Sequence, residues 1–191
     1  MTTDGKRGRI YFKNELAQLA ARPGHPERLA GWSALWRWQE EAMIEIFFSY
    51  AHEDEELMDE VRRQLIVYER LGRILKWHDR KIPPGVEWQT EIDERLKRAQ
   101  IILLFMSPRF IESKYCYLTE GQEALRRHDT KEAAVIPIVL RPCAWEESPF
   151  GKLQALPTDA KPLSTWDNFD IASLNVARGV ISVVDKLIEQ R

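Results

Sequence analysis

Short apolar runs alternate with amphipathic stretches along most of this 191-residue chain. Compact runs that are rich in β-branched and aromatic residues are typical of buried strands. Such runs cover Ile44–Ser49, Ile74–Trp77, Ile101–Met106 and Val135–Leu140, and Leu163–Trp166 is expected to add a short fifth strand. Pro137 lies within the fourth run and cannot donate to a strand ladder, so a local bulge is expected there.

Segments with a helical period separate these runs. An apolar stripe of Leu57, Met58, Val61, Leu65 and Tyr68 predicts an amphipathic helix over Glu53–Tyr68. Further helices are expected at positions 88–99, at about Ser113–His128 and over Asn175–Glu189. Strands that alternate with helices predict parallel βαβ units with right-handed crossovers. The expected fold is therefore α/β, a doubly wound five-stranded parallel sheet with any site beyond the carboxyl ends of its strands.

Residues 1–42 follow a different pattern, and we expect them to form a short helical extension ahead of a domain that spans 43–191. Prolines and a glycine at 23–26 interrupt the first helical signal, and a second helical stretch begins near Glu27. One face of this stretch is apolar and contains Leu29, Trp32, Leu35 and Trp36, with Trp38 close by. Two interpretations remain open: the segment packs onto the following domain, or it forms an assembly or partner surface.

Composition narrows the classes of function. The formal net charge of −2 argues against a nucleic-acid binder that works by bulk electrostatics. No run approaches the roughly 18–20 apolar residues that span a bilayer, and the N-terminus has no secretory signal pattern. The two cysteines, Cys116 and Cys143, have no CxxC or CxxH spacing, so we expect no zinc site. A cytoplasmic protein is expected.

Three motifs follow one another along the predicted domain. Ile46–Tyr50 is a strand that ends in Ser-Tyr and leads to an acidic helix start at Glu53-Asp54. Asp79–Gly85 places an acidic-basic pair ahead of Pro-Gly. The third motif starts at Ser107-Pro108, passes an aromatic-Cys pair at Tyr115-Cys116 and reaches Glu120. In this order and spacing the motifs resemble those of the TIR domain family, bacterial type, as do the stretches VIPIVLRPCAW and FGKLQALP.

The resemblance implies the flavodoxin-like TIR fold and one of two kinds of activity. Many TIR domains cleave NAD+, either as glycohydrolases or as synthases of a cyclic ADP-ribose-type signal. Others are non-catalytic adaptors that bind further TIR domains. Catalytic and non-catalytic TIR domains share this fold, so only the residues of the site distinguish between the two kinds of activity. The chain contains neither GxGxxG nor GxxxxGK[ST], which argues against a Rossmann dehydrogenase or a P-loop NTPase.

By this resemblance, Glu120 is the candidate catalytic residue. Cleavage of the nicotinamide–ribose bond builds positive charge on the ribose, and one carboxylate is enough to stabilise it because nicotinamide is a good leaving group. Glu120 follows the strand Ile101–Met106 and is expected near the carboxyl edge of the sheet. Judged by position alone, a glutamate early in a helix needs no role beyond its effect on the helix dipole. Glu123 is the alternative acid on the same helix.

Other residues are expected to bind the substrate. The resemblance places Ser49 and Tyr50 at the nicotinamide-ribose pocket, although a simple strand-to-helix turn also explains them. His52 is interpreted as a surface residue at a helix start. The loop after the second strand is expected either to meet the pyrophosphate of NAD+ or to touch other TIR copies, through Asp79, Arg80 and Lys81.

The aromatic wall of the pocket is ambiguous in the sequence. Many catalytic TIR domains have an aromatic residue four positions before the glutamate, but here that position is Cys116. Either Tyr115 or Tyr117 is therefore expected to supply the wall, or the register is shifted, and Cys116 is expected with them among the substrate-binding residues.

The sequence thus predicts an NAD+ glycohydrolase that uses NAD+ as substrate and needs no cofactor. The resemblance implies a prokaryotic immune or antiphage effector that is active on self-association with other TIR domains. A synthase of a cyclic ADP-ribose-type signal and a non-catalytic TIR scaffold are the alternatives.

Overall fold

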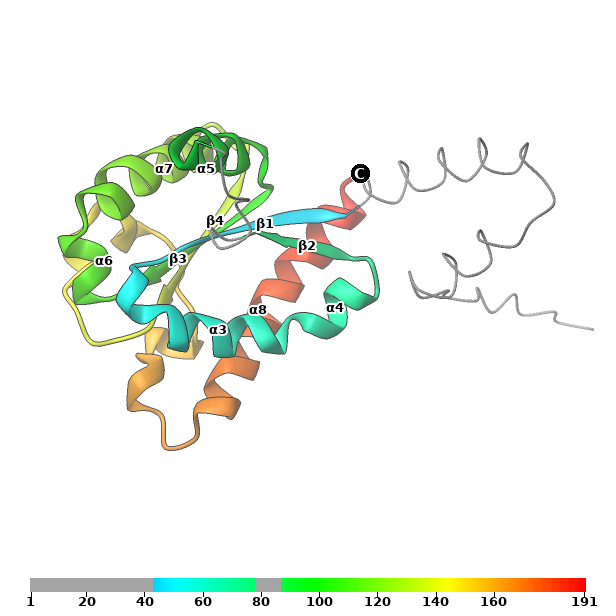
Figure 1. Cartoon of the computed structure of the whole chain (residues 1–191). Coiled ribbons are helices and arrows are strands. Elements are labelled where there is room, and N and C mark those ends of the chain that lie inside the picture. Colours follow the sequence, from blue (N-terminus) through cyan, green and yellow to red (C-terminus); the bar gives the residue numbers. More distant parts are fainter. Residues whose placement is uncertain (1–42, 78–86) are drawn as a thin grey trace, which may run out of the picture.

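The computed structural model describes residues 43–77 and 87–191, which form a parallel sheet between two layers of helices (Figure 1). The strands are β1 (Ile44–Ser49), β2 (Ile74–Trp77), β3 (Ile101–Met106) and β4 (Ala134–Val139). They lie in the order β2-β1-β3-β4, and every neighbouring pair is parallel. The winding direction reverses between β1 and β3, so the carboxyl ends of these two strands form the switch point where α/β folds place their sites.

Helices cover both faces of this sheet (Figure 1). On one side lie α3 (Glu55–Gln64), α4 (Ile66–Arg70) and the long α8 (Phe169–Glu189). On the other lie α5 (Trp88–Arg98), α6 (Pro108–Glu112) and α7 (Gly121–Asp129), with the π-helical segment η3 (Tyr115–Glu120) between α6 and α7. The remaining short 3-10 turns are η1 (His52–Asp54), η4 (Trp145–Glu147), η5 (Pro149–Lys152), η6 (Thr158–Ala160) and η7 (Leu163–Thr165).

The strands separate two hydrophobic cores by the alternation of their side chains. In β1, Ile46 and Phe48 face α3 and α8, whereas Phe47 faces the layer of α5, α6 and α7. All six residues of β1 and all six of β3 are buried. Strands that are buried on both faces are typical of parallel sheets in α/β proteins, which confirms the predicted fold class.

The expected fifth strand at Leu163–Trp166 is wrong. Leu163–Thr165 forms the 3-10 turn η7, which starts directly after Pro162. The position beside β4 is taken instead by Leu156, which makes a single parallel bridge to Ile138. Within the two described ranges, the sheet therefore has four strands.

Pro137 sits in β4 without the bulge that we expected. The register between β3 and β4 runs without interruption over six residue pairs. The carbonyl of Pro137 accepts from the backbone N–H of Leu156 at 2.9 Å, on the side away from β3. In a strand, the N and the C=O of one residue point to the same side. The nitrogen of Pro137 therefore also points away from β3, and its missing N–H removes no hydrogen bond between β3 and β4.

Three helix predictions need correction at their boundaries. The helix expected over Glu53–Tyr68 divides into η1, α3 and α4, with a break at Leu65. The C-terminal helix starts at Phe169 rather than Asn175, because the Asn168 side chain caps it by accepting from Ile171 N at 3.1 Å. The segment expected as one helix over about Ser113–His128 begins with the π-helical turn η3.

Candidate functional site

A cleft of about 470 Å³ opens at the carboxyl end of β1. Its lining residues come from the end of β1 and the turn after it, from α5, from α6 and from η3. They are Phe47, Tyr50, Ala51, His52, Glu53, Ile92, Arg109, Glu112, Ser113, Tyr115, Cys116 and Glu120. Four of the residues selected from the sequence, Tyr50, Tyr115, Cys116 and Glu120, thus meet in one cleft.

Glu120 lines this cleft but is itself only 5% exposed. The hydroxyl of Ser49 donates a hydrogen bond to Oε2 of Glu120, although the two residues are 71 positions apart in the sequence. Ser49 is 1% exposed and ends β1. A hydrogen bond between two buried groups is stronger than one in water, so Ser49 fixes the orientation of the carboxylate. Ser49 therefore contacts Glu120 directly and is not among the residues that line the cleft.

The π-helical turn η3 determines which side chains reach the cleft. Its wider turn is closed by the N–H of Gly121, which donates to the carbonyl of Cys116 five residues earlier. With this geometry Tyr115, Cys116 and Glu120 all reach the cleft. π-Helical turns are rare and occur frequently at functional sites. A hydrophobic pattern that repeats every 3.6 residues indicates an α-helix and does not reveal a π-helical turn, so the sequence did not predict η3.

The structure brings Tyr115 to the cleft and leaves Tyr117 out of it. Tyr117 packs against the core residue Phe150, with ring centroids 5.6 Å apart and an interplanar angle of 87°. Burial raises the pKa of the Tyr115 phenol well above its usual value, and the nearby Glu120 carboxylate raises it further. The Tyr115 hydroxyl is therefore neutral over the whole physiological pH range.

Cys116 connects η3 to the end of β1. Its thiol Sγ lies 3.4 Å from the backbone carbonyl of Tyr50 and donates to it. Its backbone N–H donates to Ser113 Oγ at 3.2 Å. With 8% exposure, the Cys116 side chain forms part of the cleft wall and contributes to holding η3 against β1.

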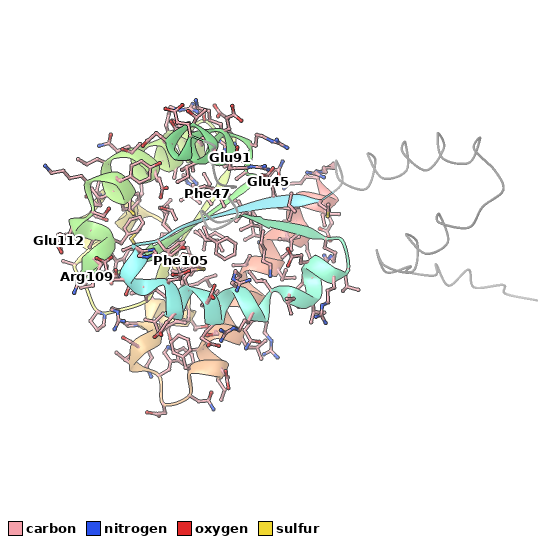
Figure 2. All side chains as sticks on the ribbon, in the orientation of Figure 1. Glu45, Phe47, Glu91, Phe105, Arg109 and Glu112 are labelled. Carbon is pink, nitrogen blue, oxygen red and sulfur yellow. The ribbon has the colours of Figure 1, made fainter. Side chains whose placement is uncertain are left out.

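Sequence reasoning missed the acidic and basic residues at the rim of the cleft. Arg109 and Glu112 both lie on the short helix α6, as Figure 2 shows. Arg109 forms a loose ion pair with Glu53, at 3.8 Å between Nη1 and Oε1, and both side chains are 59% exposed. His52, which like Glu53 belongs to η1, also lines the cleft, whereas the sequence indicated only a surface residue at this position. No motif marks these positions, and the sequence predicts a helix only from about Ser113 onward, after the end of α6.

A second polar cluster ties together the carboxyl ends of three strands. Asp54 is 1% exposed, accepts from the Ser107 hydroxyl at the end of β3, and accepts from Arg141 Nε at 2.8 Å just after β4. Ser107 also caps α6, because its Oγ accepts from Phe110 N at 3.0 Å. Asp54 thus anchors the start of the helix that supplies Arg109 and Glu112 to the cleft.

The other candidates lie elsewhere. Glu123 is not part of the cleft lining and forms an ion pair with Arg126 at 2.8 Å, which lowers the pKa of its carboxyl group. Asp79, Arg80 and Lys81 lie outside the described residues. Over the ranges that the structure covers, no group of three potential metal ligands gathers. No helix there is both long and apolar enough to cross a membrane.

Comparison with known proteins adds three findings. Residues 46–174 match the model of the TIR domain family. The chain is 48% identical over 138 residues to the uncharacterised protein y4lF of Sinorhizobium fredii, a match that covers 72% of this chain and 43% of that protein. The chain thus spans less than half the length of this curated relative.

The fold also has a solved counterpart. The TIR domain of the Toll-related receptor TRR-2 from Hydra magnipapillata superposes with a TM-score of 0.53 and covers 73% of this chain and 97% of its own. Its sequence is 21% identical, so this likeness concerns the fold alone.

Proposed function

This chain belongs to the TIR domain family, and from that premise we propose that it is an NAD+ glycohydrolase with Glu120 as its catalytic residue. The observation that carries the proposal is the placement of Glu120. Its carboxylate is buried, oriented by Ser49, and lines a cleft at the carboxyl edge of the sheet. The cleft volume of about 470 Å³ falls in the range of small-molecule sites.

The proposed reaction breaks the bond between C1′ of the ribose and the nicotinamide nitrogen. The bonding electron pair leaves with nicotinamide, which becomes neutral, and positive charge develops on the ribose. The Glu120 carboxylate stabilises this charge and holds the ribose hydroxyls. Water then adds to C1′ and releases a proton, so that NAD+ and water give nicotinamide, ADP-ribose and a proton.

The surrounding residues take supporting roles in this proposal. Ser49 orients the carboxylate through its hydrogen bond. Tyr50 and Tyr115 offer aromatic faces that are able to stack on the nicotinamide ring. The loop containing Asp79, Arg80 and Lys81 is proposed to meet the pyrophosphate, in this copy or in a neighbouring TIR domain. We further propose that the reaction takes place in the cytoplasm of a prokaryotic cell, as part of an immune response that depends on self-association.

The test compares NAD+ consumption by the wild-type protein with that of two matched variants, by chromatography at high protein concentration with a crowding agent. Glu120→Gln removes the charge in the cleft. Glu123→Gln makes the same change three residues later in the chain, outside the cleft. We expect nicotinamide release from the wild type and from Glu123→Gln, and none from Glu120→Gln. Full activity in Glu120→Gln would refute the assignment.

The second product separates the remaining alternatives. ADP-ribose identifies a hydrolase, whereas a cyclic product identifies a signal synthase that uses the same carboxylate. Intact NAD+ in every sample, together with concentration-dependent self-association, would instead favour a scaffold that binds other TIR domains.

A further inference from the structure

The mouth of the cleft carries a guanidinium group. Arg109 lies on α6 at the outer edge of the molecule, whereas Phe47, which also lines the cleft, lies in its interior (Figure 2). The Arg109 side chain is 59% exposed and Glu120 is 5% exposed, so the cleft has a carboxylate at its depth and a guanidinium at its mouth. Among the described residues that line the cleft, Arg109 is the one arginine and none is a lysine. Its charge is permanent, because a guanidinium does not lose its proton in proteins.

The ion pair between Arg109 and Glu53 is weak. Nη1 and Oε1 are 3.8 Å apart, whereas charge-assisted hydrogen bonds between such groups are about 2.7–2.9 Å long. Arg141, by comparison, holds Asp54 at 2.8 Å. Both side chains of the Arg109–Glu53 pair are well exposed, and a pair that is this open to solvent contributes little to stability. A stronger anion is therefore able to replace Glu53 at little cost.

The Arg109 side chain is not needed to form α6. The hydroxyl of Ser107 caps this helix by accepting from Phe110 N at 3.0 Å. The contribution of Arg109 itself comes from its backbone carbonyl, which accepts from Ser113 N at 3.0 Å. The helix thus holds the guanidinium at the cleft through hydrogen bonds that do not involve the guanidinium, which leaves the side chain available to a ligand.

We infer that Arg109 binds the pyrophosphate of NAD+, and that Glu53 competes with this pyrophosphate for the guanidinium. The inference rests on the proposed NAD+ site at Glu120. NAD+ has a positive charge on the nicotinamide ring beside the bond that breaks, and negative charges on the pyrophosphate beyond the ribose. The cleft offers the opposite charge at each end, with the Glu120 carboxylate inside and Arg109 at the mouth. A planar guanidinium is able to donate two parallel hydrogen bonds to phosphate oxygens.

The other polar groups at the mouth make this cation important. Glu112 lies on the same helix as Arg109, while Glu53 and His52 lie on η1, and all of them line the cleft. Without Arg109, a pyrophosphate would meet the carboxylates of Glu53 and Glu112 here, and like charges repel each other. The contact with Arg109 is separate from the one proposed for the loop after β2.

Binding measurements distinguish a phosphate contact from a structural role. Titration calorimetry in the Glu120→Gln background compares NAD+ with nicotinamide riboside, which has the same ring and ribose but no phosphate. Arg109→Gln should weaken the binding of NAD+ about tenfold, because a charge-assisted contact is lost. The Kd of nicotinamide riboside should change less than about twofold, since this ligand has no group for the guanidinium to bind. If Glu120→Gln still cleaves NAD+, the KM values give the same comparison.

Arg98→Gln is the matched control. The Arg98 side chain is 66% exposed and forms an equally loose pair with Glu45, at 3.7 Å, but it does not line the cleft. The Kd of neither ligand should change in this variant.

Glu53→Gln tests the competition. Loss of this carboxylate should tighten NAD+ binding about two- to fivefold, because the exposed ion pair no longer has to be broken. The gain should shrink when Arg109 is also replaced by glutamine. An equal gain in both backgrounds would show that Glu53 only repels the phosphate, and would overturn the competition.

Three outcomes would overturn the role of Arg109. These are equal NAD+ affinities in Arg109→Gln and Arg98→Gln, an equal loss for both ligands in Arg109→Gln, and no binding of NAD+ to any variant. If the wild type cleaves NAD+ and Arg109→Gln binds it normally, the Arg109 inference alone fails. If the wild type leaves NAD+ intact but binding depends on Arg109, the glycohydrolase proposal fails and the phosphate contact stands.

Discussion

Gly121 lies between the candidate catalytic residue and the core, and its replacement by alanine tests how rigidly η3 is held. A Cβ at this position would lie 2.6 Å from Cζ of Phe150 and 3.1 Å from the carbonyl oxygen of Cys116. Ordinary contacts between carbon atoms are about 3.5–4.0 Å, so Phe150 or the helix must shift by roughly 1 Å.

Phe150 has little freedom to make that shift. It is 1% exposed, and the rings of Phe110 and Tyr117 pack edge-on against it at 6.4 and 5.6 Å. Overpacking of such a core costs about 1–3 kcal/mol, while replacing a helical glycine by alanine contributes about 1 kcal/mol in the opposite direction. We therefore expect Gly121→Ala to lower the free energy of unfolding by up to about 2 kcal/mol. For a domain of this size that corresponds to a fall in Tm of up to roughly 8 °C.

Scanning calorimetry of four proteins measures this effect. Gly179→Ala is the control, because the added Cβ there meets the terminal methyls of Leu156, which is only half-buried and able to rotate. Its Tm should change less than that of Gly121→Ala. Phe150→Leu in the Gly121→Ala background should recover part of the loss in Tm, because the smaller side chain relieves the contact with the added Cβ. If Gly121→Ala unfolds at or above the wild-type temperature, the argument from rigid packing is wrong.

Three further predictions concern the polar groups at the sheet edge. Ser49→Ala should slow the proposed NAD+ cleavage roughly 10- to 100-fold, because the carboxylate of Glu120 loses the donor that orients it, and the initial rate of nicotinamide release measures this. Arg141→Ala should destabilise the fold by about 1–3 kcal/mol in urea unfolding, since Asp54 loses its cation, although the 45% exposure of Arg141 keeps the cost below that of a fully buried pair. The pKa of Tyr115 is raised in the folded protein, so above pH 10 the unfolded chain loses the phenol proton first and the stability of the fold decreases as the pH increases. Tyr115→Phe removes this group and should therefore lessen the decline in Tm between about pH 10 and 12.

The sequence predicted the elements whose signal is local. The runs at Ile44–Ser49, Ile74–Trp77 and Ile101–Met106 match the observed strands residue for residue, because each is a short, mostly apolar run in a parallel sheet that lies between two layers of helices. The prediction of a strand at Leu163–Trp166 was wrong for a physical reason. A short apolar stretch fits a strand or a turn equally well, and Pro162 together with packing against the core selects the turn.

The site was only partly predictable, because long-range contacts assemble it. The contacts that join Ser49 to Glu120 and Cys116 to Tyr50 span 71 and 66 residues, and no window of sequence contains either pair. The choice between Tyr115 and Tyr117 depends on the π-helical turn, which has no signature in the periodicity. Glu112 lies in the cleft lining because Ser107 caps a helix over Pro108–Glu112, ahead of the helix that the sequence predicted from about Ser113.

Two buried carboxylates lie at this edge of the sheet, and their surroundings separate their roles. Asp54 and Glu120 are 1% and 5% exposed, and each accepts a hydrogen bond from a serine at the carboxyl end of a strand, Ser107 directly after β3 and Ser49 as the last residue of β1. Asp54 is also paired with the guanidinium of Arg141, so its charge is compensated within the fold and stabilises the edge. Glu120 lines the cleft, where the cationic ribose of the proposed reaction would meet its carboxylate directly. Asp54→Asn should therefore lower the stability of the domain, and Glu120→Gln should remove NAD+ cleavage while the domain still unfolds cooperatively.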